Sequence, residues 1–228
     1  MSILHFVYVI LLVLVAACFQ PSHVLAAAQF EDTASPSSYL NNSPCPNAED
    51  IAPCVCTYWD VYHSLDIDCM SIEDEQQLYD VFHANIPDPN FRRLDLGTDN
   101  LKTLTDTVFG DVTFETVWTH STGFYGILTS VGPETFMKSA PTLRELYMPY
   151  NNLSNFPFQS LSQYTELTDF VLHDNPVSNF PIIQSENLRY IDLGAATFDI
   201  IPTGALDGLP NLEEFDVSST TSIHSMAA

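Results

Sequence analysis

The sequence predicts an α/β fold in which short parallel strands stack into a solenoid behind a disulfide-stapled amino-terminal cap. Four clustered cysteines precede an apolar frame that recurs along the rest of the chain. This frame, L-x-x-L-x-L-x-x-N-x-L, is that of leucine-rich repeats, whose strands line the concave face of a horseshoe. Its leading position is apolar in six successive copies: Leu94, Val117, Leu146, Phe170, Ile191 and Phe215.

The clearest copy of the frame spans residues 188–212, LRYIDLGAATFDIIPTGALDGLPNL. Its end, IPTGALDGLPNL, resembles the animal form L-P-x-G-x-F-x-G-L-x-x-L. One such unit cannot bury its apolar side alone, so neighbouring units must stack on it. The core positions expected from this copy are Leu188, Ile191, Leu193, Ala196, Phe198, Ile201, Ala205, Leu209 and Leu212.

The asparagine position of the frame is filled by Asn151 and Asn175. A buried amide there can bond backbone groups that the turn leaves free. Other residues occupy the position in the remaining copies, so we expect an imperfect ladder: Asp99, Thr122, Ala196 and Thr220. The 29-residue step from Val117 to Leu146 is the longest, and predicts a looser, bulging convex segment.

The charge of the chain is strongly negative. Among 228 residues, six are Lys or Arg and 29 are Asp or Glu, which gives a net charge of −23 and a pI near 4.1. Such a field repels nucleic acid and anionic membranes, and it favours cationic partners or simple solubility.

Residues 1–26 have the features of a signal peptide, with an apolar run at Ile3–Phe19 and small residues after it. The leader lacks Lys and Arg, so an uncleaved anchor is the alternative. Residues 27–44, rich in Ser, Pro and Asn, predict a flexible mature terminus that carries a glycosylation sequon at Asn41. We expect a secreted, extracellular protein without a membrane segment after cleavage.

The predicted cap spans residues 45–90 and contains the four mature cysteines: Cys45, Cys54, Cys56 and Cys69. An even set of cysteines behind a leader indicates disulfides, although spacing alone leaves three pairings open. Zinc is the rival interpretation, but C-x-C with such long gaps is not a common zinc spacing. Ser71–Asn85 predicts a helix with Ser71 as its N-cap and one apolar stripe: Leu78, Val81 and Phe82.

The cap resembles the amino-terminal cysteine cap of extracellular leucine-rich-repeat proteins. This resemblance implies Cys45–Cys56 and Cys54–Cys69 bridges. The run from Ile51 to Val117, with its helix DEQQLYDVFHANIP, resembles secreted arthropod leucine-rich-repeat proteins related to the non-catalytic subunit of Oplophorus-luciferin 2-monooxygenase. That family implies a secreted scaffold partner, with the light-emitting chemistry on another polypeptide.

Side chains alternate across a strand, so the residue between two core positions points to the other face. That column places Trp118, Tyr147 and Val171 side by side, with Asp95 and Asp192 around them. An exposed apolar patch with a polar rim is typical of a protein-binding site. A second sequon, at Asn152, is expected to face solvent at the turn.

The sequence contains no nucleophile elbow, phosphate-binding loop or dinucleotide fingerprint, and its histidines are scattered. We therefore expect no catalytic residues, no metal site and no cofactor. Asp66 and Asp68 could touch Ca²⁺, but a solvated acidic strand explains them better. The prediction is a secreted binding or scaffold protein that recognises a protein partner, such as a secreted enzyme subunit. A structural matrix protein and an innate recognition ectodomain are the alternatives.

The repeats are predicted over residues 91–228, and they look incomplete at the carboxyl end. Phe215 begins a sixth strand, but the frame fails at Ser222. An uncovered last repeat would leave apolar side chains and a strand edge in water. We expect a fragment of a longer product, with the residues from about Phe215 onward the least protected part of the repeats.

Overall fold

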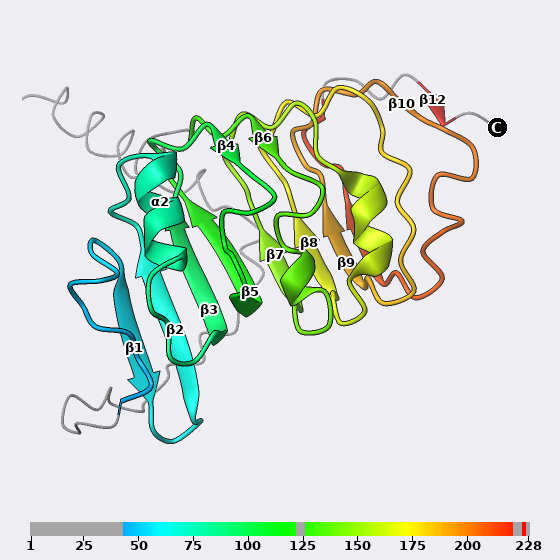
Figure 1. Ribbon diagram of the computed structural model, residues 1–228. Coiled ribbons are helices and arrows are strands. Elements are labelled where there is room, and N and C mark those ends of the chain that lie inside the picture. Colours follow the sequence, from blue (N-terminus) through cyan, green and yellow to red (C-terminus); the bar gives the residue numbers. More distant parts are fainter. Residues whose placement is uncertain (1–42, 122–125, 221–224, 227–228) are drawn as a thin grey trace, which may run out of the picture. The chain divides into compact units, whose positions relative to one another are not determined.

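The computed structural model describes residues 43–121, 126–220 and 225–226 (Figure 1). The predicted signal peptide, the Asn41 sequon and Thr122 lie outside the described residues. One mixed sheet of eight strands dominates, with the order β1-β2-β3-β5-β7-β8-β9-β11. Its strands are β1 (Val55–Trp59), β2 (Ser64–Cys69), β3 (Asn90–Gly97), β5 (Thr113–His120), β7 (Glu145–Tyr147), β8 (Asp169–Val171), β9 (Tyr190–Asp192) and β11 (Glu214–Asp216).

Every neighbouring pair from β2 to β11 is parallel, and only β1 runs antiparallel, against β2. The leading positions of the sequence frame meet in register across this sheet. Leu94 pairs with Val117, and the alignment continues through Leu146, Phe170, Ile191 and Phe215. The first five of these side chains are at most 1% exposed, so they form one row of the core.

The segments between the strands return across one side of the sheet and carry short elements (Figure 1). These are the helix α2 (Glu75–Phe82), the short strands β4 (Thr103–Leu104), β6 (Ser130–Val131), β10 (Ile200–Ile201) and β12 (Ser225–Met226), and the 3₁₀ helices η1 (Met137–Ser139) and η2 (Phe158–Gln163). β4 pairs with β6 and β10 pairs with β12, both in parallel.

The N-cap of helix α2 lies three residues later than the sequence predicts, and the helix ends at Phe82 and not at Asn85. Asp74, not Ser71, is the N-cap, and its carboxylate accepts a hydrogen bond from the Gln77 N–H at 2.8 Å. Residues 71–73 stay outside the helix because Ile72 is buried and its N–H bonds to Cys69 O. The prediction of Ser71 is therefore wrong, and aspartate caps a helix as well as serine does. The predicted apolar stripe is buried: Leu78, Val81 and Phe82.

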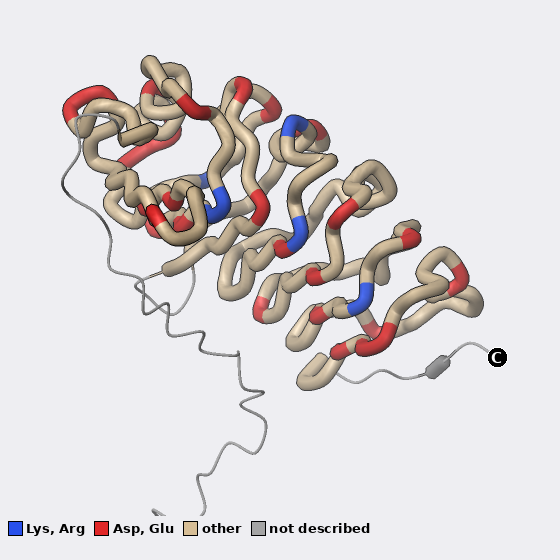
Figure 2. Tube along the Cα trace, turned by 90° about the horizontal axis from the view of Figure 1, so that it is seen from below, with Lys and Arg blue, Asp and Glu red and all other residues tan. Residues whose placement is uncertain are grey.

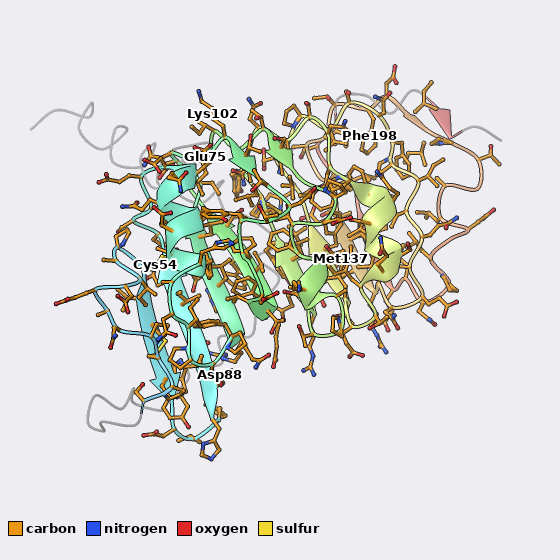
Figure 3. The ribbon with its side chains drawn as sticks, in the orientation of Figure 1. Cys54, Glu75, Asp88, Lys102, Met137 and Phe198 are labelled. Carbon is orange, nitrogen blue, oxygen red and sulfur yellow. A yellow bond between two sulfur atoms is a disulfide. The ribbon has the colours of Figure 1, made fainter. Side chains whose placement is uncertain are left out.

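Glu75, the first residue of α2, links the helix to the segment that follows β3 (Figure 3). The Glu75 carboxylate accepts hydrogen bonds from the backbone N–H groups of Lys102 (2.7 Å) and Thr103 (3.3 Å). The bond from Lys102 N–H is the main reason why the pKa of Glu75 is lowered.

The core is held by two disulfides and two aromatic clusters. The bridges are Cys45–Cys56 and Cys54–Cys69, the pairing that the resemblance implies. Buried phenylalanines pack edge to face in both halves of the sheet, an arrangement that aromatic rings prefer. One cluster contains Phe82, Phe109 and Phe114, and the other contains Phe156, Phe158 and Phe170.

Two buried amides hold the turns after β7 and β8. The Asn175 amide nitrogen donates to Leu172 O, His173 O and, one strand back, Met148 O at 2.9 Å, while its oxygen accepts from Leu153 N–H. Asn151 donates to Met148 O and Pro149 O, and to the Thr119 hydroxyl. The hydrogen bonds expected of the asparagine position are therefore present at both residues.

Candidate protein-binding face

We call the outward face the surface of the sheet made by side chains that alternate with the core positions. Its members come from consecutive strands in register, so they form two rows across the sheet. The first row is Arg93, Thr116, Glu145, Asp169, Tyr190 and Glu214, and the second is Asp95, Trp118, Tyr147, Val171, Asp192 and Asp216.

An aromatic pair marks the middle of this face. The rings of Trp118 and Tyr147, on the neighbouring strands β5 and β7, have centroids 5.2 Å apart and planes tilted by 40°. They border a hollow of about 510 Å³, which we call the aromatic hollow. Among the described residues it is lined by Trp118, Thr119, His120, Ser121, Tyr147, Pro149 and Tyr150.

A charged cluster borders the aromatic pair on the β3 side. The Arg93 guanidinium holds Asp95 with two hydrogen bonds, of 2.8 and 2.7 Å, and its central carbon lies 4.1 Å from the centre of the Trp118 ring. His120 Nε2 lies 2.9 Å from Asp95 Oδ1. Burial alone would raise the pKa of Asp95, but the hydrogen bonds from His120 and Arg93 outweigh burial and lower it.

Two carboxylates face each other on the β7–β8 side. Glu145 and Asp169 are directly opposite in register. Burial, followed by the negative charge of Asp169, raises the pKa of Glu145. Within the part of the chain that the structure describes, the buried Trp118 indole N–H has no acceptor at good hydrogen-bond geometry, but it lies close enough to Glu145 to oppose that rise in pKa. Burial and nearby carboxylates also raise the pKa of Tyr190 to about 12.

A second histidine–carboxylate pair lies at the carboxyl ends of β8 and β9. His173 Nδ1 is 2.8 Å from Asp192 Oδ2, and Asp192 Oδ1 accepts from the Gly194 N–H. Burial disfavours the charged imidazole, yet the hydrogen bond to Asp192 and its charge raise the pKa of His173 overall. The Tyr150 ring meets the His173 ring edge to face at 4.9 Å, which connects this pair to the aromatic hollow.

The structure brings together most of the predicted patch, but not all of it is accessible. Trp118 and Tyr147 are in contact and half-buried, and Asp95 is joined to Trp118 through Arg93. The expected exposure of Val171 is wrong, since only 2% of it is exposed. Val171 has a short side chain and lies between Tyr147 and Asp192 in the same row, so it offers little surface to a partner. Asp192 is 8% exposed and held by His173.

Several residues of this face, or two positions beyond its second row, were not among the predicted site residues: Arg93, His120, Glu145, Asp169, His173 and Tyr190. The period-two alternation that located Trp118 also assigns these positions to the same face. The alternation does not predict which of these side chains contact one another, because contacts between strands depend on rotamers as well as on register. Asn152, the predicted acceptor of the second sequon, is exposed, and its glycosylation stays a prediction.

The acids beside Cys69 are engaged within the protein. Asp66 accepts hydrogen bonds from the Trp59 indole and the Arg92 guanidinium, and Asp68 accepts from Met70 N–H. Across residues 43–121, 126–220 and 225–226, no group of three or more His, Cys, Asp or Glu side chains is placed to hold a metal ion. Within the same residues, no helix combines the length and apolar character that a membrane span requires.

Comparison with known proteins gives one informative likeness. The chain is 34% identical over 177 residues to the Oplophorus-luciferin 2-monooxygenase non-catalytic subunit of Oplophorus gracilirostris. It is a distant homologue of that subunit. The matched region covers 77% of this chain and 48% of the relative, so the chain spans about half the length of the relative. No protein-family model matches the chain.

Proposed function

We propose that the protein is a secreted, non-catalytic leucine-rich-repeat binding protein that holds a protein partner on its outward face. The observation that carries the proposal is the 34% identity, across 77% of this chain, to a protein named a non-catalytic subunit. A subunit works by contact with another polypeptide, so the chain requires a surface suited to one.

The leucine-rich-repeat assignment is supported by the register of the sheet and by the buried amides. Parallel strands recur at the spacing of the sequence frame, and each frame leader pairs with the next. Asn151 and Asn175 bond the backbone of their turns, the role that the frame gives to its asparagine. In this proposal the outward face is the concave side of the horseshoe.

Secretion is supported by the cysteines and by the leader-like residues 1–26. All four cysteines of the described residues are paired, and disulfides persist mainly in oxidising compartments. An extracellular location also accounts for the acidic composition, because a net charge of −23 keeps a protein soluble and limits its contacts with anionic surfaces.

The binding site is placed at the aromatic hollow because it combines an aromatic anchor with a polar rim. Trp118 and Tyr147 offer rings that are already positioned by each other and by Arg93. Tryptophan and tyrosine, held in a concave site and surrounded by polar groups, dominate the energetics of many protein interfaces. A rigid pair also loses little conformational entropy on binding.

The test is affinity capture from the native extracellular fluid with purified protein, followed by sequencing of what co-purifies. Trp118→Ala should weaken binding of the recovered partner by about 2 kcal/mol, without loss of the fold. Tyr79→Ala is the control, since Tyr79 is an exposed aromatic on α2, away from the sheet face. A partner that binds wild type and Trp118→Ala equally would contradict the site, and a matrix role would predict that result.

A further inference from the structure

The outward face is unbalanced in charge. Acids recur on successive strands, whereas Lys and Arg are few (Figure 2). In the two rows that define this face, the single basic residue is Arg93. The acids of the same rows are Asp95, Glu145, Asp169, Asp192, Glu214 and Asp216.

The basic residue of the face is already paired with one of its acids. Arg93 is committed to Asp95 through two hydrogen bonds and lies over Trp118. Among the described residues, neither Glu145 nor Asp169 forms an ion pair. Their direct opposition in register makes the centre of the face a place where a positive group from outside would be stabilised.

The protein itself shows how a cation fits this surface. Arg93 lies between a carboxylate two residues along its own strand and an aromatic ring on the next strand. Glu145 and Tyr147 place a carboxylate and an aromatic ring on the same face, because residues two apart on a strand lie about 7 Å apart on one side of the sheet. A guanidinium or ammonium group beside Glu145 would therefore be near a carboxylate and within reach of the face of an aromatic ring.

We infer that the partner reaches the outward face through a basic polypeptide segment. An arginine or lysine side chain would pair with Glu145 and Asp169 beside Tyr147, and a neighbouring apolar side chain would enter the aromatic hollow. The inference rests on the proposed function and adds the chemistry of the partner. The sign of the charge excludes nucleic acid and anionic lipid as occupants, since both would meet the acids of this face.

The test uses labelled peptides and the full-length protein, with binding followed by fluorescence anisotropy. An extended peptide of about nine residues is long enough to cross the central strands, which lie about 4.8 Å apart. Three peptides are compared: one alternates arginine with leucine, one replaces arginine with glutamate, and one replaces leucine with serine. We expect the arginine–leucine peptide to bind, the glutamate peptide not to bind, and the arginine–serine peptide to bind less tightly.

Two charge-matched variants separate a site from a general attraction to an acidic protein. The double variant Glu145→Gln, Asp169→Asn should bind the arginine–leucine peptide about tenfold more weakly than wild type, an effect typical of a desolvated charge pair. Asp60→Asn with Glu166→Gln removes the same charge at exposed positions off the face, and should change the affinity by less than about twofold. Thermal unfolding of both variants verifies that they are folded.

Equal weakening by the two variants would overturn the inference, because the attraction would then come from net charge alone. No binding of the arginine–leucine peptide would overturn it as well. The proposed function fails separately. If a captured partner loses affinity for Trp118→Ala but binds the Glu145→Gln, Asp169→Asn variant normally, the binding face stands and its basic partner does not.

Discussion

The two halves of the sheet reach the same parallel stacking by different means. In the amino-terminal half, β3 and β5 are eight residues long and pair over seven positions, behind a cap with two disulfides. In the carboxyl-terminal half, β7, β8 and β9 are three residues long and pair over three positions each. The buried amides of Asn151 and Asn175 lie in this second half.

This contrast shows how a short strand can be kept in register. A long ladder satisfies most of its backbone groups by itself, whereas a three-residue strand leaves those of the following turn unpaired. A buried side-chain amide supplies the missing partners and, in Asn175, also reaches the preceding turn. The amino-terminal half therefore depends on covalent bonds and ladders, and the carboxyl-terminal half on side chains.

The largest expected loss of stability is in the carboxyl-terminal half. Phe170→Ala should lower the free energy of unfolding by about 4 kcal/mol, because a large cavity replaces a buried ring. Phe170 is 0% exposed and packs against Phe156 and Phe158. Equilibrium urea unfolding followed by circular dichroism measures it. Ile182→Ala is the control, since this side chain is 75% exposed, and a comparable loss there would contradict the assignment of the core.

The next effect concerns the cap. Replacing Cys54 and Cys69 together by alanine should cost about 3 kcal/mol, as expected for a bridge that closes a loop of about 15 residues. Hydrogen exchange should accelerate in β2 and α2 while amides of β8 and β9 remain protected. Uniform acceleration along the chain would mean that the two halves unfold as one unit, and the contrast between them would be wrong.

The amides themselves give a smaller effect with a fixed order. Asn175→Ala should cost about 2 kcal/mol, because it leaves the buried Leu153 N–H unpaired along with carbonyls of the turn. Asn151→Ala should cost less, since the Asn151 side-chain oxygen accepts no hydrogen bond within the described residues. Urea unfolding of both variants measures the difference, and the opposite order would contradict this account of the turns.

The smallest expected effect is on the pH dependence of stability, to which each half of the sheet contributes one titratable group. The pKa of Asp95 is lowered in the folded state, so its contribution is present above about pH 4 and is lost as pH falls through the folded pKa. The pKa of His173 is raised, so its contribution is complete below about pH 6.5 and is lost as pH rises through the folded pKa. Each should be about 0.5–1 kcal/mol.

Thermal unfolding over a pH series measures both contributions. His173→Gln should remove the part that changes above neutral pH and leave the acid side unchanged. Asp95→Asn should do the reverse. If His173→Gln alters only the acid side of the profile, the pairing with Asp192 does not stabilise the fold as described.

Much of this fold could be predicted because its determinants are local and repeated. The frame located the core row from Leu94 to Ile191, and the alternation along each strand located Trp118 and Tyr147 on the other face. Asn151 and Asn175 were identified by their position in the frame, where a buried amide can bond backbone groups of the turn. In each case the apolar, aromatic or polar character of a residue at a fixed position of the frame was enough for the prediction.

The remaining features depend on geometry that spacing does not contain. The start of α2 was set by competition between two good caps, Ser71 and Asp74, and the burial of Ile72 decided it. Likewise, the burial of Val171 depends on the length of the side chains next to it. The pairing of His173 with Asp192 joins residues 19 apart in sequence, and it follows only when register and rotamer are both known.

The reach of Asn175 back to Met148 also limits how the length of this chain can vary in evolution. Asn151 lies five positions after Leu146, and Asn175 lies five positions after Phe170. The strand-to-strand intervals differ, with 24 residues from Leu146 to Phe170 and 21 from Phe170 to Ile191. The difference in length between these two repeats therefore lies between the asparagine and the next strand, on the outer side of the molecule, and it leaves the face that carries Trp118 and Tyr147 in alignment.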